Sequence, residues 1–251
     1  LACLIMLAFG DIIDPEGKAA TDFNGIVSPI VYDNEQHIVC KNNPKDDVEP
    51  FEYNDRTRTL YAGADSVSAG KFAFTFPVPL DINYSDEPGL IILHAISHDK
   101  SIEAQGLFED FLIGDTYIEE QTDTVGPTIA AYSDGHNTGE ISITTTTPTI
   151  RITLYDENGI NTTGNGLGHD IIAIIDGKEA LTYTLNSHYT QAIGDYRSGT
   201  VEYTLPTLPA GKHTLTVRAF DTLNNMGEGH YSFEAVEGLQ EEYDIFDTAG
   251  R

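Results

Sequence analysis

Apolar and polar residues alternate with a period of two along much of this chain. The clearest example is the segment 71–78, which places Phe72, Phe74, Phe76 and Val78 on one face. The alternation recurs at Ile150/Ile152/Leu154, Val201/Tyr203/Leu205, Leu215/Val217/Ala219 and Tyr231/Phe233/Ala235. No stretch of a dozen residues keeps apolar positions at helical spacing. The pattern therefore predicts half-buried antiparallel strands.

Residues that favour chain reversal separate these predicted strands. They form the clusters Asp14-Pro15-Glu16-Gly17, Asp156-Glu157-Asn158-Gly159, Asp176-Gly177 and Leu208-Pro209-Ala210-Gly211. Each cluster supplies a residue that tolerates a positive φ, or a proline with a preset φ, where the chain must turn. Short strands separated in this way are typical of β-sandwiches.

A polar, acidic stretch at 114–127 ends in Gly126-Pro127 and has the composition of a linker. It predicts a first β-sandwich domain over 1–122, a second, immunoglobulin-like β-sandwich domain over 123–237, and a tail over 238–251. Each half has roughly 120 residues, close to the ~100 of an immunoglobulin-like sandwich. We therefore expect an all-β fold with two tandem immunoglobulin-like antiparallel β-sandwich domains.

Charge excludes several classes of partner. The chain of 251 residues carries 13 Lys and Arg against 40 Asp and Glu, a formal net charge of −27. Nucleic-acid binding requires clustered basic residues, so it is not expected here. The longest apolar run, 1–9, is much shorter than the ~20 residues of a transmembrane helix, and we interpret it as a buried strand. The start at Leu1 rather than Met indicates a fragment or a trimmed product.

Cysteine and histidine residues give no catalytic pair. Cys3 and Cys40 are interpreted as two small buried hydrophobes, with a single disulfide as the alternative. His37 lies three residues from Cys40, which places the two side chains on opposite faces of a strand. His94 and His98 lie in an apolar run that reads as a strand, where four residues span ~13 Å, too far to share one metal ion.

Calcium is the one ligand that the acidic composition favours. Oxygen-rich loops at the ends of sandwiches can collect the six to eight ligands that this ion takes. The candidates are Asp156, Glu157 and Asn158, or Asp221 with Asn224 and Asn225. The complete calcium-loop pattern with its distal Glu is absent, so a solvated turn is the favoured interpretation and a calcium site the alternative. No other cofactor is expected.

Several motifs of the second half resemble a known family. They are 156–161 (Asp-Glu-Asn-Gly-Ile-Asn), 164–171 (Gly-Asn-Gly-Leu-Gly-His-Asp-Ile), 195–199 (Asp-Tyr-Arg-Ser-Gly) and 208–211 (Leu-Pro-Ala-Gly). The first half matches in the same order, with 22–25 (Asp-Phe-Asn-Gly), 63–67 (Gly-Ala-Asp-Ser-Val) and 76–79 (Phe-Pro-Val-Pro). From about Phe9 to Val236 the chain resembles the region that follows the catalytic domain of the type IX secretion system sortase, a gingipain-family cysteine peptidase of Bacteroidota.

The resemblance implies a role at the cell surface. Sortases of this family cleave a C-terminal secretion signal from cargo at the outer membrane and join the cargo to a surface lipopolysaccharide. Their Cys-His machinery lies in an upstream caspase-like domain, and no residue of this sequence matches it. The chain alone is therefore expected to be a non-catalytic segment that supports or docks the peptidase domain.

The same resemblance implies partners, a location and a contact site. The expected partners are the upstream catalytic domain of the same polypeptide and outer-membrane proteins of the secretion system. The expected location is extracytoplasmic, at the outer membrane or cell surface of a Gram-negative bacterium, and the tail 238–251 resembles the start of a sorting-tail strand. A candidate contact loop comprises Gly164, Asn165, Gly166, Gly168, His169, Asp170, Tyr196 and Arg197.

Two other functions remain open at this point. The first is a free-standing adhesion or glycan-binding module, which would present an exposed aromatic platform near Tyr183, Tyr189 and Tyr196. The second is a spacer stiffened by calcium, whose melting temperature would rise with the calcium concentration.

Overall fold

The fold is all-β and consists of curled, mainly antiparallel sheets that form β-sandwich units, as expected from the alternation. The computed structural model describes residues 4–40, 49–80, 82, 87–113, 123–133, 136–137, 142–162 and 168–238. Within these residues there are 21 strands and two single-turn 3-10 helices, η1 (Glu179–Leu181) and η2 (Asn186–His188). Every strand pairing in this part of the chain lies within residues 4–113, the first unit, or within 123–238, the second unit.

The first unit is built around one seven-stranded sheet. Its order is β1-β7-β6-β2-β9-β10, and β5 also pairs with β2. The strands of this unit are β1 (Leu4–Asp11), β2 (Gly25–Tyr32), β3 (Gln36–Val39), β4 (Glu52–Asp55), β5 (Thr59–Ala62), β6 (Asp65–Ser68), β7 (Lys71–Val78), β8 (Glu87–Pro88), β9 (Leu90–Ser97), β10 (Glu103–Phe108) and β11 (Leu112–Ile113). Strands β3 and β4 form a separate ribbon, and β8 pairs with β11.

Aromatic side chains on the inner face of the sheet form the centre of the first unit. Phe74 and Phe76 of β7 stack against Tyr61 of β5, with ring centroids 6.3 and 5.3 Å from the Tyr61 ring. Phe72 and Val78 of the same strand pack at the edge of this core and are half-buried. The predicted alternation of 71–78 is thereby confirmed.

The hairpin between β6 and β7 shows how a local sequence sets a strand pairing. Ala69 and Gly70 both have positive φ, 51° and 73°, as a two-residue turn of type I′ requires. The side-chain oxygen of Asn24 accepts a hydrogen bond from the Ala69 N–H at 3.0 Å, which helps to hold the one non-glycine residue in this conformation.

The second unit is a β-sandwich of two facing sheets. One sheet has the order β12-β15-β19-β18 and the other β13-β14-β21-β20-β16-β17. All described pairings are antiparallel except that of β14 with β21, which is parallel. The strands are β12 (Thr128–Ser133), β13 (His136–Asn137), β14 (Ser142–Thr145), β15 (Thr149–Tyr155), β16 (Ile172–Ile175), β17 (Thr182–Thr184), β18 (Tyr189–Ala192), β19 (Asp195–Thr204), β20 (Gly211–Phe220) and β21 (Met226–Val236).

The core of the second unit follows the predicted alternation closely. Ile150, Ile152 and Leu154 of β15 are buried between the sheets. The same core contains Val201, Leu205, Leu215, Val217, Ala219 and Phe233 from the strands that the alternation predicted, and Ala235 is buried as well. Tyr203 and Tyr231 pack at its edge and are half-buried.

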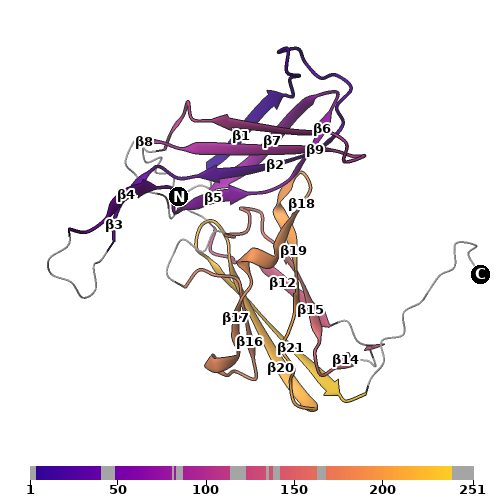
Figure 1. Cartoon of the computed structure of the whole chain (residues 1–251). Helices are drawn as coiled ribbons and strands as arrows, with labels where there is room; N and C mark the ends of the chain where they lie inside the picture. The colour runs from indigo at the N-terminus through magenta and orange to yellow at the C-terminus, as the bar shows by residue number, and fades with distance from the viewer. Residues whose placement is uncertain are drawn as a thin grey trace, which may run out of the picture.

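Hydrogen bonds between described residues join the two units directly. The Gly194 N–H donates to the Ala64 carbonyl at 2.9 Å, and the Leu80 N–H donates to the Thr222 carbonyl at 3.1 Å. The Gln191 side chain donates to the Tyr61 hydroxyl at 2.8 Å. Figure 1 shows the β18–β19 end of the second unit against the sheet of the first. The predicted domain boundary at 122/123 stays a prediction, because 114–122 lie outside the described residues, as does the tail beyond 238.

The segment 1–9 differs from the expectation. Residues from Leu4 onward do form a strand, β1, but it lies at the edge of the sheet and is not buried. Leu7 and Phe9 are 63% and 81% exposed. Cys40 is likewise half-buried rather than buried, and it is a free cysteine, whereas Cys3 lies outside the described residues. No helix in the described ranges is long and apolar enough to cross a membrane.

Candidate functional site

We call the hydrogen-bonded contact between the two units the joint. Three carboxylates meet at the end of the second unit that lies beside it. Asp123 precedes β12, Asp156 directly follows β15 and Asp221 directly follows β20. One carboxylate oxygen from each of the three lies within 4.8 Å of the others. Asp221 is fully buried and Asp156 is nearly so. This acidic cluster is the one group of possible metal ligands found among the described residues.

Turn geometry positions two of these carboxylates. Asp221 accepts hydrogen bonds from the N–H groups of Leu223 and Asn225, at 3.0 and 2.7 Å, and from the Asn225 side-chain amide at 2.8 Å. Asp156 accepts the N–H of Asn158 at 2.8 Å, the usual Asx-turn contact. The Asn158 side-chain amide then donates to Asp123. The turns predicted from the sequence therefore hold the cluster in place.

Burial makes the cluster electrostatically costly. Burial raises the pKa of Asp156 to about 6, and the nearby carboxylates of Asp221, Asp123 and Glu157 add to the shift. Burial also raises the pKa of Asp221, although its three hydrogen bonds oppose the change. A proton on Asp156 or a cation at the three oxygens would relieve this repulsion. Calcium binding here stays a prediction.

The structure assembles only part of the predicted calcium set. Asp156 and Asp221 come together, and Asn158 reaches the cluster through Asp123. Glu157 instead points away, where it accepts the Tyr155 hydroxyl and lies 3.8 Å from the Arg197 guanidinium.

The remaining candidates of the calcium set hold the turn after β20. The Asn224 N–H donates to the Asp221 carbonyl, and Asn224 has a φ of 67°. Asn225 is a hydrogen-bond donor to Asp221. Asp123 was not among the sequence candidates, because only the tertiary fold brings it near residues 33 and 98 positions further along the chain.

The predicted contact loop is divided between two places. Gly164, Asn165 and Gly166 lie outside the described residues, and Gly168 is exposed with a φ of 86°. The His169 ring packs on Phe220, with centroids 4.6 Å apart, and Asp170 is half-buried.

The other two residues of this set belong to β19. Tyr196 packs against the aromatic core of the first unit and so forms part of the joint. Arg197 donates to Asp195 at 2.8 Å and thereby holds the pKa of that carboxyl below its ordinary value. These two side chains therefore stabilise the joint end of β19.

Cysteine and histidine residues keep the separation expected from the strand pattern. The His37 ring contacts Asn54 at 3.0 Å and Glu52 at 3.2 Å, on one face of the β3–β4 ribbon. Cys40 pairs with Phe51 through its N–H and falls on the opposite face. His94 lies on β9, as predicted, 3.5 Å from Glu103 of the neighbouring strand.

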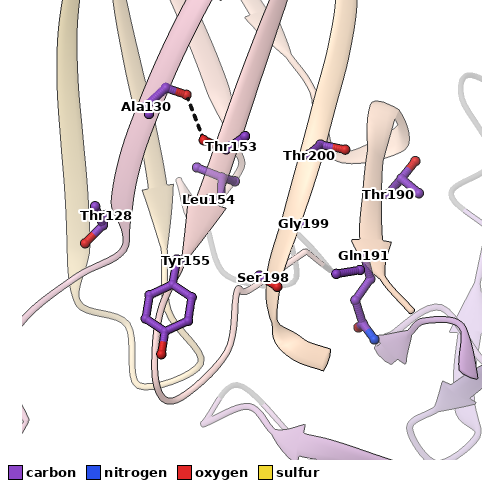
Figure 2. Close-up of a pocket in the computed structure, with 11 residues that line it drawn as sticks. Thr128, Ala130, Thr153, Leu154, Tyr155, Thr190, Gln191, Ser198, Gly199 and Thr200 are labelled. Carbon is purple, nitrogen blue, oxygen red and sulfur yellow. Dashed lines mark hydrogen bonds between the residues drawn. The ribbon is translucent and has the colours of Figure 1, made fainter. Parts of the chain in front are cut away.

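A shallow groove of about 350 Å³ crosses the outer face of the β12-β15-β19-β18 sheet. Its floor is a row of small residues that pair across the strands, Ala130, Thr153, Thr200 and Thr190. Figure 2 shows these residues with Tyr155, Ser198 and Gln191 along one side. Hydroxyl groups dominate the polar atoms of this lining, and it contains no titratable group other than the Tyr155 phenol.

Two all-β units of the β-sandwich type, joined end to end, define the class of protein. No family model matches the chain, and no curated protein matches it. Among solved structures, the chain is similar to the crystal structure of dimeric latent PorU from Porphyromonas gingivalis, with 30% identity and a TM-score of 0.56. PorU is the type IX secretion sortase, so the resemblance that the motifs indicated is confirmed.

The extent of this similarity is unequal in the two proteins. It covers 95% of this chain and 22% of the PorU chain. The chain therefore spans about a fifth of the protein that it matches.

Proposed function

We propose that this chain is the non-catalytic β-sandwich segment of a sortase-like cell-surface cysteine peptidase, in which it supports or docks the peptidase domain. The observation that carries this proposal is the match of nearly the whole chain to a small part of PorU. In such a protein, most of the polypeptide lies outside this segment. The expected partners are the upstream catalytic domain and outer-membrane proteins of the secretion system, at the outer membrane or cell surface of a Gram-negative bacterium.

The joint between the two units suits a supporting role. Two of its hydrogen bonds run between backbone groups, and Tyr196 of the second unit packs into the aromatic cluster of the first. Burial raises the pKa of Tyr61 to about 12, so its hydroxyl stays neutral as the acceptor for Gln191 at any physiological pH. A joint of this kind holds the two units in a fixed relative orientation better than a flexible linker does.

The test compares the isolated chain with the full-length gene product that contains it. We expect the isolated chain to hydrolyse no peptide substrate, and we expect deletion of this segment to lower the melting temperature or the activity of the remaining protein. Peptide hydrolysis by the isolated chain, lost on Cys40→Ala, would overturn the proposal. A catalytic domain that keeps its stability and activity without the segment would do so too.

No observation favours the glycan-binding alternative at the three tyrosines that suggested it. Tyr183 packs on Tyr203 with ring centroids 5.7 Å apart, at the edge of the core. The Tyr189 hydroxyl is buried, and Tyr196 faces the first unit. The three rings therefore form no exposed platform.

A further inference from the structure

The β3–β4 ribbon extends away from the body of the first unit. Within the described residues, the two strands pair only with each other. Figure 1 shows them reaching out at the left of the view, clear of the seven-stranded sheet. An isolated two-stranded hairpin is marginally stable in water, so such a ribbon needs further packing to be well ordered.

The register of the ribbon separates its two faces chemically. Ile38 lies opposite Tyr53, and the Cys40 N–H donates to the Phe51 carbonyl at 2.9 Å. Because alternate residues share a face, Ile38, Cys40, Phe51 and Tyr53 form one apolar face of the ribbon. His37, Val39, Glu52 and Asn54 form the other, where the imidazole contacts both polar partners.

The apolar face is exposed at its two aromatic residues, whereas Ile38 and Cys40 are half-buried. The Phe51 and Tyr53 rings stack with centroids 5.8 Å apart. Phe51 is 67% exposed and Tyr53 is 39% exposed. Rigid aromatic side chains presented together in this way are typical of the central contacts in protein interfaces.

Charge identifies the kind of surface that would cover this face. Residues 35–40 and 49–56 carry four acidic side chains, Glu35, Glu49, Glu52 and Asp55, against one basic side chain, Arg56, whose guanidinium donates to the Asp33 and Pro88 carbonyls. A second copy of this chain would bring another net charge of −27 to the interface. Repulsion between the two negatively charged chains would oppose their association. An apolar groove with Lys or Arg at its rim complements the ribbon in both respects.

We propose that the β3–β4 ribbon is a docking arm, whose apolar face fills a basic-rimmed apolar groove on the catalytic domain of the same polypeptide. This inference rests on the proposed function and names the surface that it uses. Since the matched region is only 22% of the PorU chain, a polypeptide of that kind holds its other domains at a high effective concentration around this arm.

The primary test is amide hydrogen exchange of the isolated chain and of the full-length gene product. We expect amides of 36–40 and 51–55 to exchange at least tenfold more slowly in the full-length protein. The difference should shrink in 0.5 M NaCl, because salt screens the acidic flank and the basic rim. This comparison uses wild-type proteins, so it does not depend on the folding of a variant.

A pair of variants sharpens the test. In the full-length protein, Phe51→Ser with Tyr53→Ser should return the exchange of the ribbon to the rate in the isolated chain. Val39→Ser replaces an apolar residue that is 48% exposed on the opposite face and should leave the protection unchanged. Equal effects of the two changes would overturn the proposal, because they would indicate loss of the hairpin rather than of a contact.

The other outcomes separate this inference from the proposed function. Protection elsewhere in the chain with an unprotected ribbon would overturn the docking arm and leave the supporting role intact. Identical exchange throughout the chain would overturn both. Ribbon protection in the isolated chain that grows with its concentration, together with a dimer in sedimentation, would assign the face to a second copy and overturn the proposed occupant.

Discussion

The two units bury their apolar residues to different degrees. The second unit has one continuous core, in which Ile150, Ile152, Val201 and Val217 are fully buried. The described core of the first unit is split into two smaller clusters. Many of its large apolar side chains remain exposed, including Leu7 and Phe9 of β1, Leu107 of β10, and Phe51. The second unit is closed on itself, whereas the first presents surface that other parts of a protein can cover.

Strand composition explains this contrast. In β15 every second residue is polar and faces solvent, so burial of one face is enough to remove the aliphatic side chains of the strand from water. Strands β1 and β9 have nearly continuous apolar runs, Leu-Ile-Met-Leu-Ala-Phe and Leu-Ile-Ile-Leu-His-Ala-Ile. Continuous runs are typical of strands that are covered on both faces. The open face of the first unit is therefore the part of the chain that depends most on its surroundings.

The largest expected effect comes from the core of the second unit. Ile152→Ala should lower the free energy of unfolding by about 2–5 kcal/mol, because it leaves a cavity between two packed sheets. Phe9→Ser on the exposed face of β1 should change it by less than about 0.5 kcal/mol. Urea unfolding followed by circular dichroism measures both. A large loss of unfolding free energy for Phe9→Ser would show that this face of the first unit is covered in solution. That result would contradict the difference in burial between the two units.

The joint is the next most sensitive place. Gly159 has a φ of 90°, and a Cβ there would lie 2.9 Å from Pro77 of the first unit and 3.0 Å from Tyr196. Gly159→Ala should cost about 2–3 kcal/mol, since steric conflict adds to the strain of a positive φ. The matched control is Gly177→Ala, where φ is also positive but nothing lies within 4 Å, and it should cost about 1 kcal/mol. Equal costs would mean that the units do not pack together.

Calcium should act on the second unit alone. If the acidic cluster binds the ion with the affinity of an extracellular module, 10 mM CaCl2 should add about 1.5–2.5 kcal/mol of stability relative to EDTA. Scanning calorimetry should show the shift in the transition of the second unit and none in Asp221→Asn. Melting curves that are identical in CaCl2 and EDTA would remove the calcium prediction and leave protonation as the way in which the cluster is relieved.

The smallest effect is the pH dependence of the same cluster. The pKa of Asp156 is about 6 in the folded chain against an ordinary value of 3.8, so the folded state binds this proton more tightly. Its contribution is fully present below about pH 4 and is lost as the pH rises through 6. In the absence of calcium, Asp156→Asn should therefore stabilise the chain by about 1 kcal/mol at pH 7.5, a value reduced for solvent screening, and by almost nothing at pH 4. Thermal melts at the two pH values measure this difference, and an equal effect at both would contradict the shift.

Sequence patterns predicted the second unit better than the first. Its strands have strict alternation and recognisable turns, so Ile152 and Val217 could be assigned to the core without coordinates. The pattern also identified Asp156 and Asp221 as residues of oxygen-rich turns. It could not find Asp123, because proximity to those turns depends on where the linker enters the sandwich. It also missed the β3–β4 ribbon, whose short strands carry mixed residues.

The sequence by itself determined the all-β class, the strands with alternating residues, the turns and the acidic character, because period-two burial and backbone preferences act over a few neighbouring residues. Its motifs also indicated the similarity to a sortase region. Tertiary structure alone decided which apolar faces remain open, which carboxylates meet, and that Tyr61 and Gln191 link the two units. These features depend on residues far apart in the chain, whose proximity is a property of the packing and not of the local pattern.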